Sequence, residues 1–286
     1  MIGSLSSQMI IGIKGAGEMA TGIACSLHYA NVKNIFMLET EQPLAVRRQV
    51  AFCEAICDQR QVVEGIEAIR ASSIEEIEDA WLVGRIPVIV DPAWRVIERF
   101  RPDVVIDAII AKKNMGTSKD EAGLVVALGP GFEAGVDVDV VIETNRGHNL
   151  GRIIRSGFAE PNTGVPGTIG GQGIKRVIRA PANGILETGH HIGDRVRCGE
   201  CIGRVGGKDV AVQLDGVLRG LIRPGTVVRK GLKIGDIDPR GQTEYCSKIS
   251  DKARSIGGAV LTAILGEFNK CPELYQQRHL VCAMAE

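Results

Sequence analysis

The 286-residue sequence has few aromatic residues, no net charge and no long apolar run. Lysine and arginine are not gathered into a stripe, so the sequence lacks the electrostatic footprint of a nucleic-acid-binding protein. The longest apolar stretches, such as 104–111, are far shorter than the roughly 18–20 residues that a membrane helix needs. We therefore expect neither a nucleic-acid partner nor a membrane span.

We also expect no secretory signal. The beginning, MIGSLSSQMI, has no basic region followed by a long apolar core and a small-residue cleavage site. The eight cysteines lie at irregular spacings in a chain long enough to build its own core. These features predict reduced thiols and a cytoplasmic protein.

The sequence is long and rich in glycine. A chain of 286 residues with 36 glycines exceeds one ordinary core and suits tight turns between short elements. A stretch rich in Gly, Asn, Pro and Thr at 145–173 has the texture of a long loop. The predicted divisions are 1–172, a nucleotide-binding domain with this loop, 173–240, a small all-β domain, and 241–286, a helical tail.

The first domain alternates short apolar runs with helical patterns. Strands are expected at 9–14 and 34–39, with a helix at 19–30 between them and a second helix at 43–58. Further apolar runs, such as 124–128, continue this alternation. The predicted fold class is therefore α/β, a Rossmann-like parallel sheet covered on both faces.

The segment from Gly15 to Ala20 matches the pattern G-x-G-x-x-[GA] between a predicted strand and a predicted helix. Gly15 permits the tight turn, Gly17 lets the backbone approach a pyrophosphate, and Ala20 lets helix and strand pack closely. Glu39 ends the second strand and is placed to accept hydrogen bonds from a ribose diol. We expect these residues to bind an NAD-like dinucleotide or a molybdopterin nucleotide.

Polar residues follow the later strands of the predicted sheet, where ligands bind in open α/β sheets. Lys112 could neutralise an anion or act as a base or amine nucleophile, and Asn114 lies beside it. The segment after the strand at 138–142 offers Glu143 and Asn145. Both could face the same ligand.

The same segment continues with Arg146 and His148. Arg146 could clamp a phosphate or carboxylate, and His148 could move protons near neutral pH. Lys112, Glu143, Arg146 and His148 are the candidate catalytic residues. The alternative is structural: an ordinary ion pair between Arg146 and Glu143, with His148 bonded to loop carbonyls.

A gapless repeat of period 32 runs through the all-β domain. Residues 183–205 align with 215–237, and 8 of these 23 positions are identical, including Gly184 with Gly216 and Val196 with Val228. Two such units can interlock and cover each other's apolar face. The pattern resembles a biotinyl/lipoyl-like barrel-sandwich hybrid. The tail helix at 250–265 could pack on either domain or on another subunit, which leaves a homo-oligomer open.

Two further signals carry little weight. Cys198 and Cys201, near His190, have the spacing of a zinc pair, but the repeat aligns them with lysines and no second pair follows. We therefore expect no metal site. Lys208 lies where carrier domains attach biotin or lipoate, but the surrounding signatures are absent, which favours an exposed hairpin lysine.

Phrases from nearly the whole chain, among them GAGEMATGIA, DAIIAKKN, LGPGFEAG, VIETNRGHNLGR, IGDIDPRG and SDKARSIGGAVL, point to one family. The sequence resembles the selenium-dependent molybdenum hydroxylase accessory (YqeB) family. The N-terminal half is also similar in kind to XdhC-like accessory proteins. The resemblance implies a role in maturing such a hydroxylase, with the apoenzyme or other maturation factors as partners.

Two other functions remain open from the residues alone. The chain could be an NAD-dependent oxidoreductase acting on a small metabolite, with Lys112 or His148 transferring protons. It could also be a non-catalytic interaction module that keeps the glycine turn without its ligand. The sequence does not decide whether the protein is an enzyme.

Overall fold

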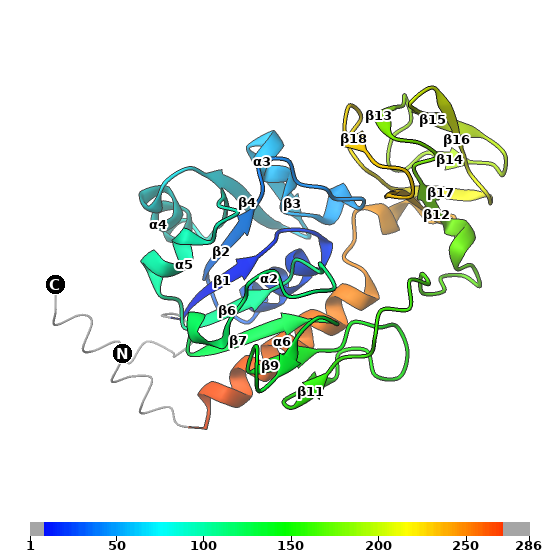
Figure 1. The fold of residues 1–286 in the computed structure, drawn as a ribbon. Coiled ribbons are helices and arrows are strands. Elements are labelled where there is room, and N and C mark those ends of the chain that lie inside the picture. The colour runs from blue at the N-terminus through cyan, green and yellow to red at the C-terminus, as the bar shows by residue number, and fades with distance from the viewer. Residues whose placement is uncertain (1–8, 271–286) are drawn as a thin grey trace.

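The computed structural model describes residues 9–270 of the chain. Figure 1 shows a large sheet with helices on both faces and a smaller part made of strands beside it. We call this smaller part, residues 177–238, the small β part. The expectation about a secretory signal concerns the first residues of the chain, mostly 1–8, and the predicted helical tail extends through 271–286. Both segments are outside the described residues.

The large sheet has nine strands in the order β10-β9-β7-β6-β1-β2-β5-β4-β3. The seven strands from β9 to β4 are parallel, and β10 and β3 at the two edges are antiparallel to their neighbours. A separate two-stranded sheet pairs β8 (Glu133–Ala134) with β11 (Gly157–Phe158). The bounds in the large sheet are β1 (Ile10–Lys14), β2 (Asn34–Glu39), β3 (Arg60–Val63), β4 (Ile66–Ala71), β5 (Ile86–Val90), β6 (Val104–Asp107), β7 (Leu124–Leu128), β9 (Val140–Ile142) and β10 (Ile153–Ile154).

Five α-helices and four short 3-10 helices are found in the described residues. The α-helices are α2 (Glu18–Tyr29), α3 (Glu54–Asp58), α4 (Ile74–Leu82), α5 (Arg95–Phe100) and α6 (Asp251–Phe268). The 3-10 helices are η1 (Arg48–Val50), η2 (Lys119–Glu121), η3 (Ile174–Arg176) and η4 (Thr243–Cys246). Between Met9 and Lys270, no helix combines the length and the apolar character needed to cross a bilayer.

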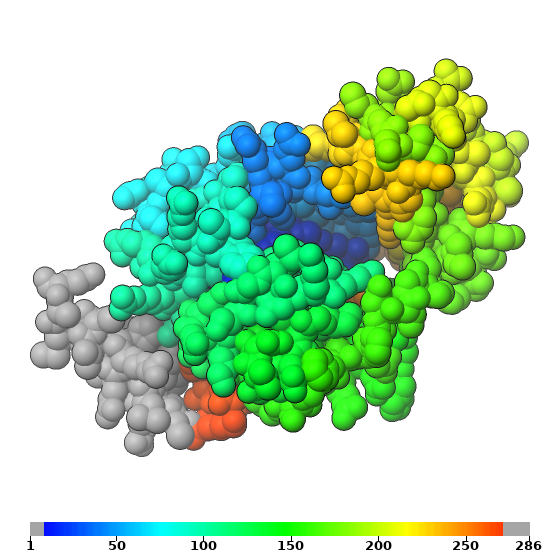
Figure 2. Space-filling view, viewed as in Figure 1, coloured from blue at the N-terminus to red at the C-terminus, as the bar shows by residue number. Residues whose placement is uncertain are grey.

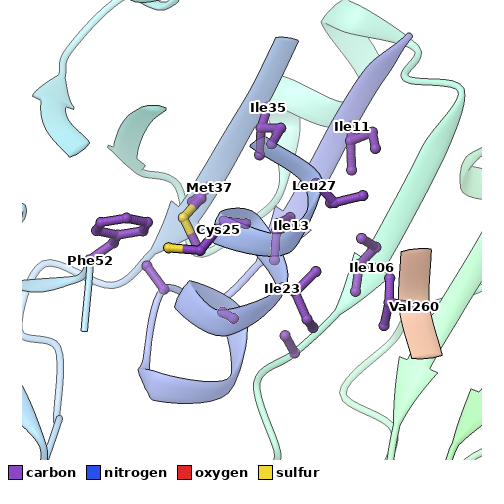
Figure 3. Close-up of a cluster of buried hydrophobic side chains, with 14 of the residues drawn as sticks. Ile11, Ile13, Ile23, Cys25, Leu27, Ile35, Met37, Phe52, Ile106 and Val260 are labelled. Carbon is purple, nitrogen blue, oxygen red and sulfur yellow. The ribbon is translucent and has the colours of Figure 1, made fainter. Parts of the chain in front are cut away.

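The alternation of side chains along the strands divides the core between the two faces of the sheet. Ile11 and Ile13 of β1 point to the face covered by α2 and α6, where they meet Ile23, Leu27 and Val260 (Figure 3). All five side chains are fully buried, and each contributes about 1.5–3 kcal/mol through burial. A second cluster on the opposite face joins strand residues to α4 and α5.

Helices α2 and α6 touch backbone to backbone. A Cβ added to Gly22 would lie 2.8 Å from the Cβ of Ala253. A Cβ added to Gly257 would lie 2.7 Å from the carbonyl oxygen of Gly22 and would clash with the hydroxyl oxygen of Ser26. Only glycine allows this approach. The C-terminal helix, orange-red in Figure 1, therefore packs on the first part of its own chain.

The predicted fold class, a Rossmann-like parallel sheet followed by a barrel-sandwich hybrid, is wrong. The large sheet is mixed, because β3 and β4 form a hairpin and β10 turns back along β9. The hairpin turn is Glu64-Gly65, with φ of 49° and 85°, the positive values that two-residue hairpin turns require. No α-helix of the described chain covers the connection from β6 to β7, which contains only η2.

The small β part consists of two separate four-stranded antiparallel sheets, not one flattened barrel. Their orders are β12-β19-β17-β14 and β16-β15-β13-β18. Each sheet takes two strands from residues 177–205 and two from residues 208–238. The two halves of the small β part must therefore fold together. The bounds are β12 (Val177–Arg179), β13 (Gly184–Glu187), β14 (Arg195–Val196), β15 (Cys201–Val205), β16 (Lys208–Ala211), β17 (Gly216–Leu221), β18 (Val227–Val228) and β19 (Lys233–Asp238).

The segment between β2 and β3 also differs from the prediction. The expected helix at 43–58 is replaced by an irregular stretch, the single turn η1 and the short helix α3. This stretch docks the small β part: Arg48 Nε donates to the carbonyl oxygen of Leu221 at 2.8 Å. Arg223 lies 2.5 Å from both Glu54 Oε2 and Asp58 Oδ2. Tertiary ion pairs therefore override the local helical pattern.

Two adjacent glycines in α6 give a test of the helix contact. Gly257→Ala is expected to lower the free energy of unfolding by about 1–3 kcal/mol, because the added methyl overpacks the contact with α2. Gly258→Ala, where a Cβ meets nothing within 4 Å, is expected to raise it by about 0.5–1 kcal/mol. Urea unfolding measures both. Equal effects from the two substitutions would contradict the close packing of α2 and α6.

Candidate ligand-binding cleft

A cleft opens where the carboxyl ends of the parallel strands face the small β part. Figure 2 shows it as a hollow with dark blue N-terminal residues at its floor, between the green surface below and the blue and orange surface above. It has two arms, the basic arm of about 430 Å³ and the apolar arm of about 480 Å³. Glu18, Met19 and Ile110 line both arms, so the arms join there.

The glycine turn lies in the apolar arm. Gly15 has a φ of 88°, and its N–H donates to the carbonyl oxygen of Leu38 at 2.7 Å. The Ala16 N–H donates to Glu39 Oε2 at 2.9 Å. Gly17 lines the arm, and Ala20 is fully buried beneath it. The protein's own groups therefore occupy the amides of Gly15 and Ala16, whereas no side chain caps the N-terminus of α2 at Gly17.

Glu39 is one of three carboxylates that line the apolar arm, with Glu18 and Asp91. Its Oε1 accepts from the Thr40 N–H at 2.8 Å while its Oε2 holds Ala16. The rest of the arm is mainly apolar, with Leu44, Trp94 and Met115 in its wall. A carboxylate in such a wall repels phosphate and accepts hydrogen bonds from hydroxyl or ring N–H groups. An anionic group of a ligand would therefore lie in the other arm.

The segment after β6 runs between the arms in a strained conformation. Ile110 has a φ of 60° and Lys112 a φ of 63°, both in the left-handed region, which is a genuine outlier for a β-branched residue. Gly131 makes this path possible, because a Cβ there would lie 2.5 Å from the Cα of Lys113. Lys112 thereby reaches the wall of the basic arm.

The buried Lys14 makes polar contacts with the segment after β6. Lys14, fully buried at the end of β1, donates to Thr117 Oγ1 at 2.8 Å and lies 2.7 Å from Glu121 Oε2. Its ammonium also lies 3.6 Å from the centre of the Trp94 ring. Burial lowers the pKa of Lys14. Sequence reasoning missed this residue, although a lysine ending an apolar strand before a glycine turn was a usable signal.

Asn114 belongs to the same segment. Its Oδ1 accepts from the N–H groups of Gly116 and Thr117, each at 2.8 Å, and its Nδ2 donates to the Thr117 carbonyl. Asp107 accepts from the Thr117 hydroxyl at 2.7 Å, and burial raises the pKa of this carboxyl. Asn114 lines neither arm. The structure thus places it as the residue that shapes the turn.

The segment after β9 brings only part of its predicted cluster to the cleft. Glu143 is buried and holds the N–H groups of Asn145 at 2.6 Å and Glu160 at 2.7 Å. Asn145 lines the basic arm and donates to Glu160 Oε2. His148 is exposed and lines neither arm. Glu143 therefore fixes the loop that carries Asn145.

Arg146 also lines the basic arm, but its partner is not the predicted Glu143. The guanidinium donates to both carboxylate oxygens of Asp251, at 2.6 and 2.7 Å, in the first turn of α6. These bonds raise the pKa of Arg146 and lower that of Asp251. The pair ties the loop after β9 to the start of α6.

Arg47 is a second cation that sequence reasoning missed, because its segment was expected to be helical. It lies 2.7 Å from Glu18 Oε1 and donates to the carbonyl oxygens of Tyr245 at 2.6 Å and Lys248 at 2.8 Å. Its side chain is 5% exposed, and its Nε–H has no acceptor among the described residues. Arg47 joins the floor of the cleft to the segment that leads into α6.

The remaining cations of the basic arm come from η3, from the small β part and from α6. Arg176 and Arg219 both pair with the buried carboxylate of Asp236. Lys233 of β19 and Lys252 of α6 line the same arm. In all, eight lysine and arginine side chains and three carboxylates line it, so the arm is suited to an anion.

Metal and carrier signals gain no support from the geometry. Among residues 9–270, no group of three or more His, Cys, Asp and Glu side chains is arranged to hold a metal ion. Cys198, Cys201 and Lys208 are all exposed in the small β part, away from both arms. The cleft is therefore the candidate site.

One comparison bears on the family. No protein-family model matches the chain. The protein described as "Uncharacterized protein YqeB" of Escherichia coli (strain K12) is 48% identical over 260 residues, which is 91% of this chain and 48% of that protein. The similarity to YqeB that the motifs predict is confirmed. The chain spans about half of the relative's length, and the relative's description assigns no activity.

Solved structures add only weak likenesses. A succinylglutamate desuccinylase/aspartoacylase from Rhodobacter sphaeroides is 24% identical over 22% of each chain, with a TM-score of 0.21. TcdA (CsdL) is 15% identical over 46% of this chain and 53% of its own, with a TM-score of 0.25. The product-bound ectoine utilization protein EutE (DoeB) from Ruegeria pomeroyi is 9% identical over 79% and 56%, with a TM-score of 0.22. Values this low assign neither a fold nor an activity.

The two glycines of the turn should respond differently to substitution. Gly17→Val is expected to leave the Tm within about 2 °C, because the backbone there has a φ of −71° and a Cβ meets nothing within 4 Å. Gly15→Val is expected to lower the Tm by roughly 4–8 °C, since a β-branched residue is strained at a φ of 88°. Calorimetry measures both. A large loss of Tm in Gly17→Val would show that the space at Gly17 is filled by the protein.

Proposed function

We propose that this chain is an accessory factor in the maturation of selenium-dependent molybdenum hydroxylases. In this role it holds a cofactor-type ligand in the cleft and docks with the hydroxylase apoenzyme or with another maturation factor. The family motifs suggest the pathway, and the similarity to YqeB over 91% of the chain agrees with the family. The cleft supports the part of the proposal in which the chain holds a ligand.

The observation that carries the proposal is the division of the cleft into unlike arms. The basic arm is rich in cations and attracts an anionic group. The apolar arm offers the ring of Trp94, the thioether of Met115 and the carboxylate of Glu39. A molybdopterin-type ligand fits this division, because it combines a planar ring that carries N–H donors with a phosphate.

The residues in the cleft favour holding a ligand over transforming it. Both oxygens of Glu143 hold backbone amides, and Arg146 is held by Asp251. His148 lines neither arm. Of the four candidate catalytic residues, Lys112 alone lines an arm without an ion-pair partner among the described residues. A single exposed lysine serves ligand neutralisation better than a proton-transfer pathway.

The ligand would span the point where the arms meet. Its phosphate would lie toward the basic arm, and its ring would lie near Glu39 and Trp94. Glu18, held by Arg47 at 2.7 Å, stands at the junction and disfavours a phosphate on the glycine turn itself. This orientation differs from that of a dinucleotide gripped by the turn.

The proposal is tested by deletion and complementation in a strain that grows on purines. Deletion is expected to abolish selenium-dependent hydroxylase activity while the amount of hydroxylase protein stays unchanged. The unsubstituted gene should restore activity, whereas Gly17→Val should not, because its side chain enters the apolar arm.

The matched control is Gly258→Ala, which alters an exposed glycine outside both arms. It should restore activity fully. Normal hydroxylase activity in the deletion strain would refute the accessory role. Full rescue by Gly17→Val, with the variant produced at the normal level, would refute the involvement of the cleft.

A further inference from the structure

We infer that Lys233 and Lys252 form a phosphate seat shared by the two parts of the chain, and that a bound phosphate clamps the small β part onto the large-sheet part. The inference rests on the proposed function for the cleft and names the ligand group that the basic arm takes. Lys233 comes from β19, and Lys252 is the second residue of α6.

The two lysines lack adequate counter-charges. The side-chain ammonium of Lys252 has no hydrogen bond or ion pair with any described residue, although Lys252 lines the basic arm. Burial lowers its pKa, and the charges of Arg146 and Lys233 lower it further against the opposing effects of Glu18 and Glu143. An ammonium in this position is stabilised by an anion supplied from outside the chain.

Lys233 competes for a carboxylate that is already in use. Its ammonium lies 3.7 Å from Asp236 Oδ1, beyond hydrogen-bond distance. Arg176 takes that same oxygen, and Arg219 Nε donates to Oδ2 at 2.9 Å. Burial lowers the pKa of Lys233, and Arg176 and Arg219 add to the lowering. Asp238 also pairs with Arg219, at 3.2 Å, but it is shared with Arg240, so Asp236 and Asp238 together face four cations.

A phosphate dianion matches this deficit in charge. It carries two negative charges for two ammonium groups and presents oxygens in several directions. Lys233 and Lys252 both line the basic arm, one from β19 and the other from the first turn of α6. The polar loop at 160–167 closes the same arm, with Asn162 and Thr163 in its wall.

The clamp follows from the origin of the two lysines. The small β part is otherwise docked through the segment that carries Arg48, Glu54 and Asp58. A phosphate between Lys233 and Lys252 adds a tie from β19 to the start of α6, which is itself fixed to Arg146 through Asp251. Ligand occupancy would thus be communicated to the orientation of the small β part.

The test uses the full chain with inorganic phosphate and pyrophosphate as probes in isothermal titration calorimetry. Lys233→Gln and Lys252→Gln are each expected to weaken pyrophosphate binding about 10- to 100-fold, the effect of losing one charge-assisted hydrogen bond. The control is Lys230→Gln, an exposed lysine of the same part that does not line the arm. It should bind like the unsubstituted chain.

Hydrogen–deuterium exchange measures the clamp. Pyrophosphate should slow exchange both in β19 and in the first turn of α6 of the unsubstituted chain. In Lys252→Gln the protection of β19 should be lost as well, although that substitution lies in the other part. Protection confined to α6 would overturn the clamp. Melting curves for each variant verify that it is folded.

The outcomes separate this inference from the accessory role. If the unsubstituted chain binds neither probe, or binds as well after either lysine substitution, the seat is overturned even where deletion abolishes hydroxylase activity. If binding changes as expected while the deletion strain keeps normal hydroxylase activity, the seat stands and the accessory role falls.

Discussion

The contact between α2 and α6 is the constraint on which the cleft depends. Gly22 and Gly257 let the two helix backbones meet, so the C-terminal helix lies along the first helix of the sheet. The N-terminal end of α6 then falls at the mouth of the cleft, where Asp251 holds Arg146 and Lys252 lines the basic arm. The segment leading into α6 is also fixed there by Arg47. One close packing contact thus assembles a site from residues far apart in the chain.

Charge then divides that site. Glu39 places a carboxylate in the apolar arm, whereas lysine and arginine outnumber carboxylates in the basic arm. Such a gradient orients any ligand that has an anionic end and an uncharged, donor-bearing end. The strained backbone at Ile110 and Lys112 lies where the arms join, and buried Lys14 donates to Thr117 of the same segment. The unfavourable backbone conformations of Ile110 and Lys112 therefore lie at the place where a ligand would bind.

The sequence predicted local features well and their assembly poorly. The first two strands, the turn at Gly15 and the start of the tail helix near 250 follow from short-range patterns, and the structure contains all three. The mixed sheet was missed because a two-residue turn at Glu64-Gly65 was not recognised. The expected helix at 43–58 failed because long-range ion pairs decide that segment.

The candidate site shows the same difference between local features, which the sequence predicted, and their assembly, which it did not. Gly17, Glu39, Lys112, Asn145 and Arg146 were predicted and do line the cleft. Arg47, Lys233 and Lys252 were not predicted, because each gains its role only when distant elements meet, and no local pattern encodes that meeting. Lys233 even aligned with an ordinary strand-flanking position of the repeat.

The most direct test of this account is the mass spectrum of the small molecule that co-purifies with the protein from its own host. The account predicts an organic ligand that carries at least one phosphate and a planar, nitrogen-containing ring, released when the protein is denatured. A neutral or cationic ligand in stoichiometric amount would contradict it.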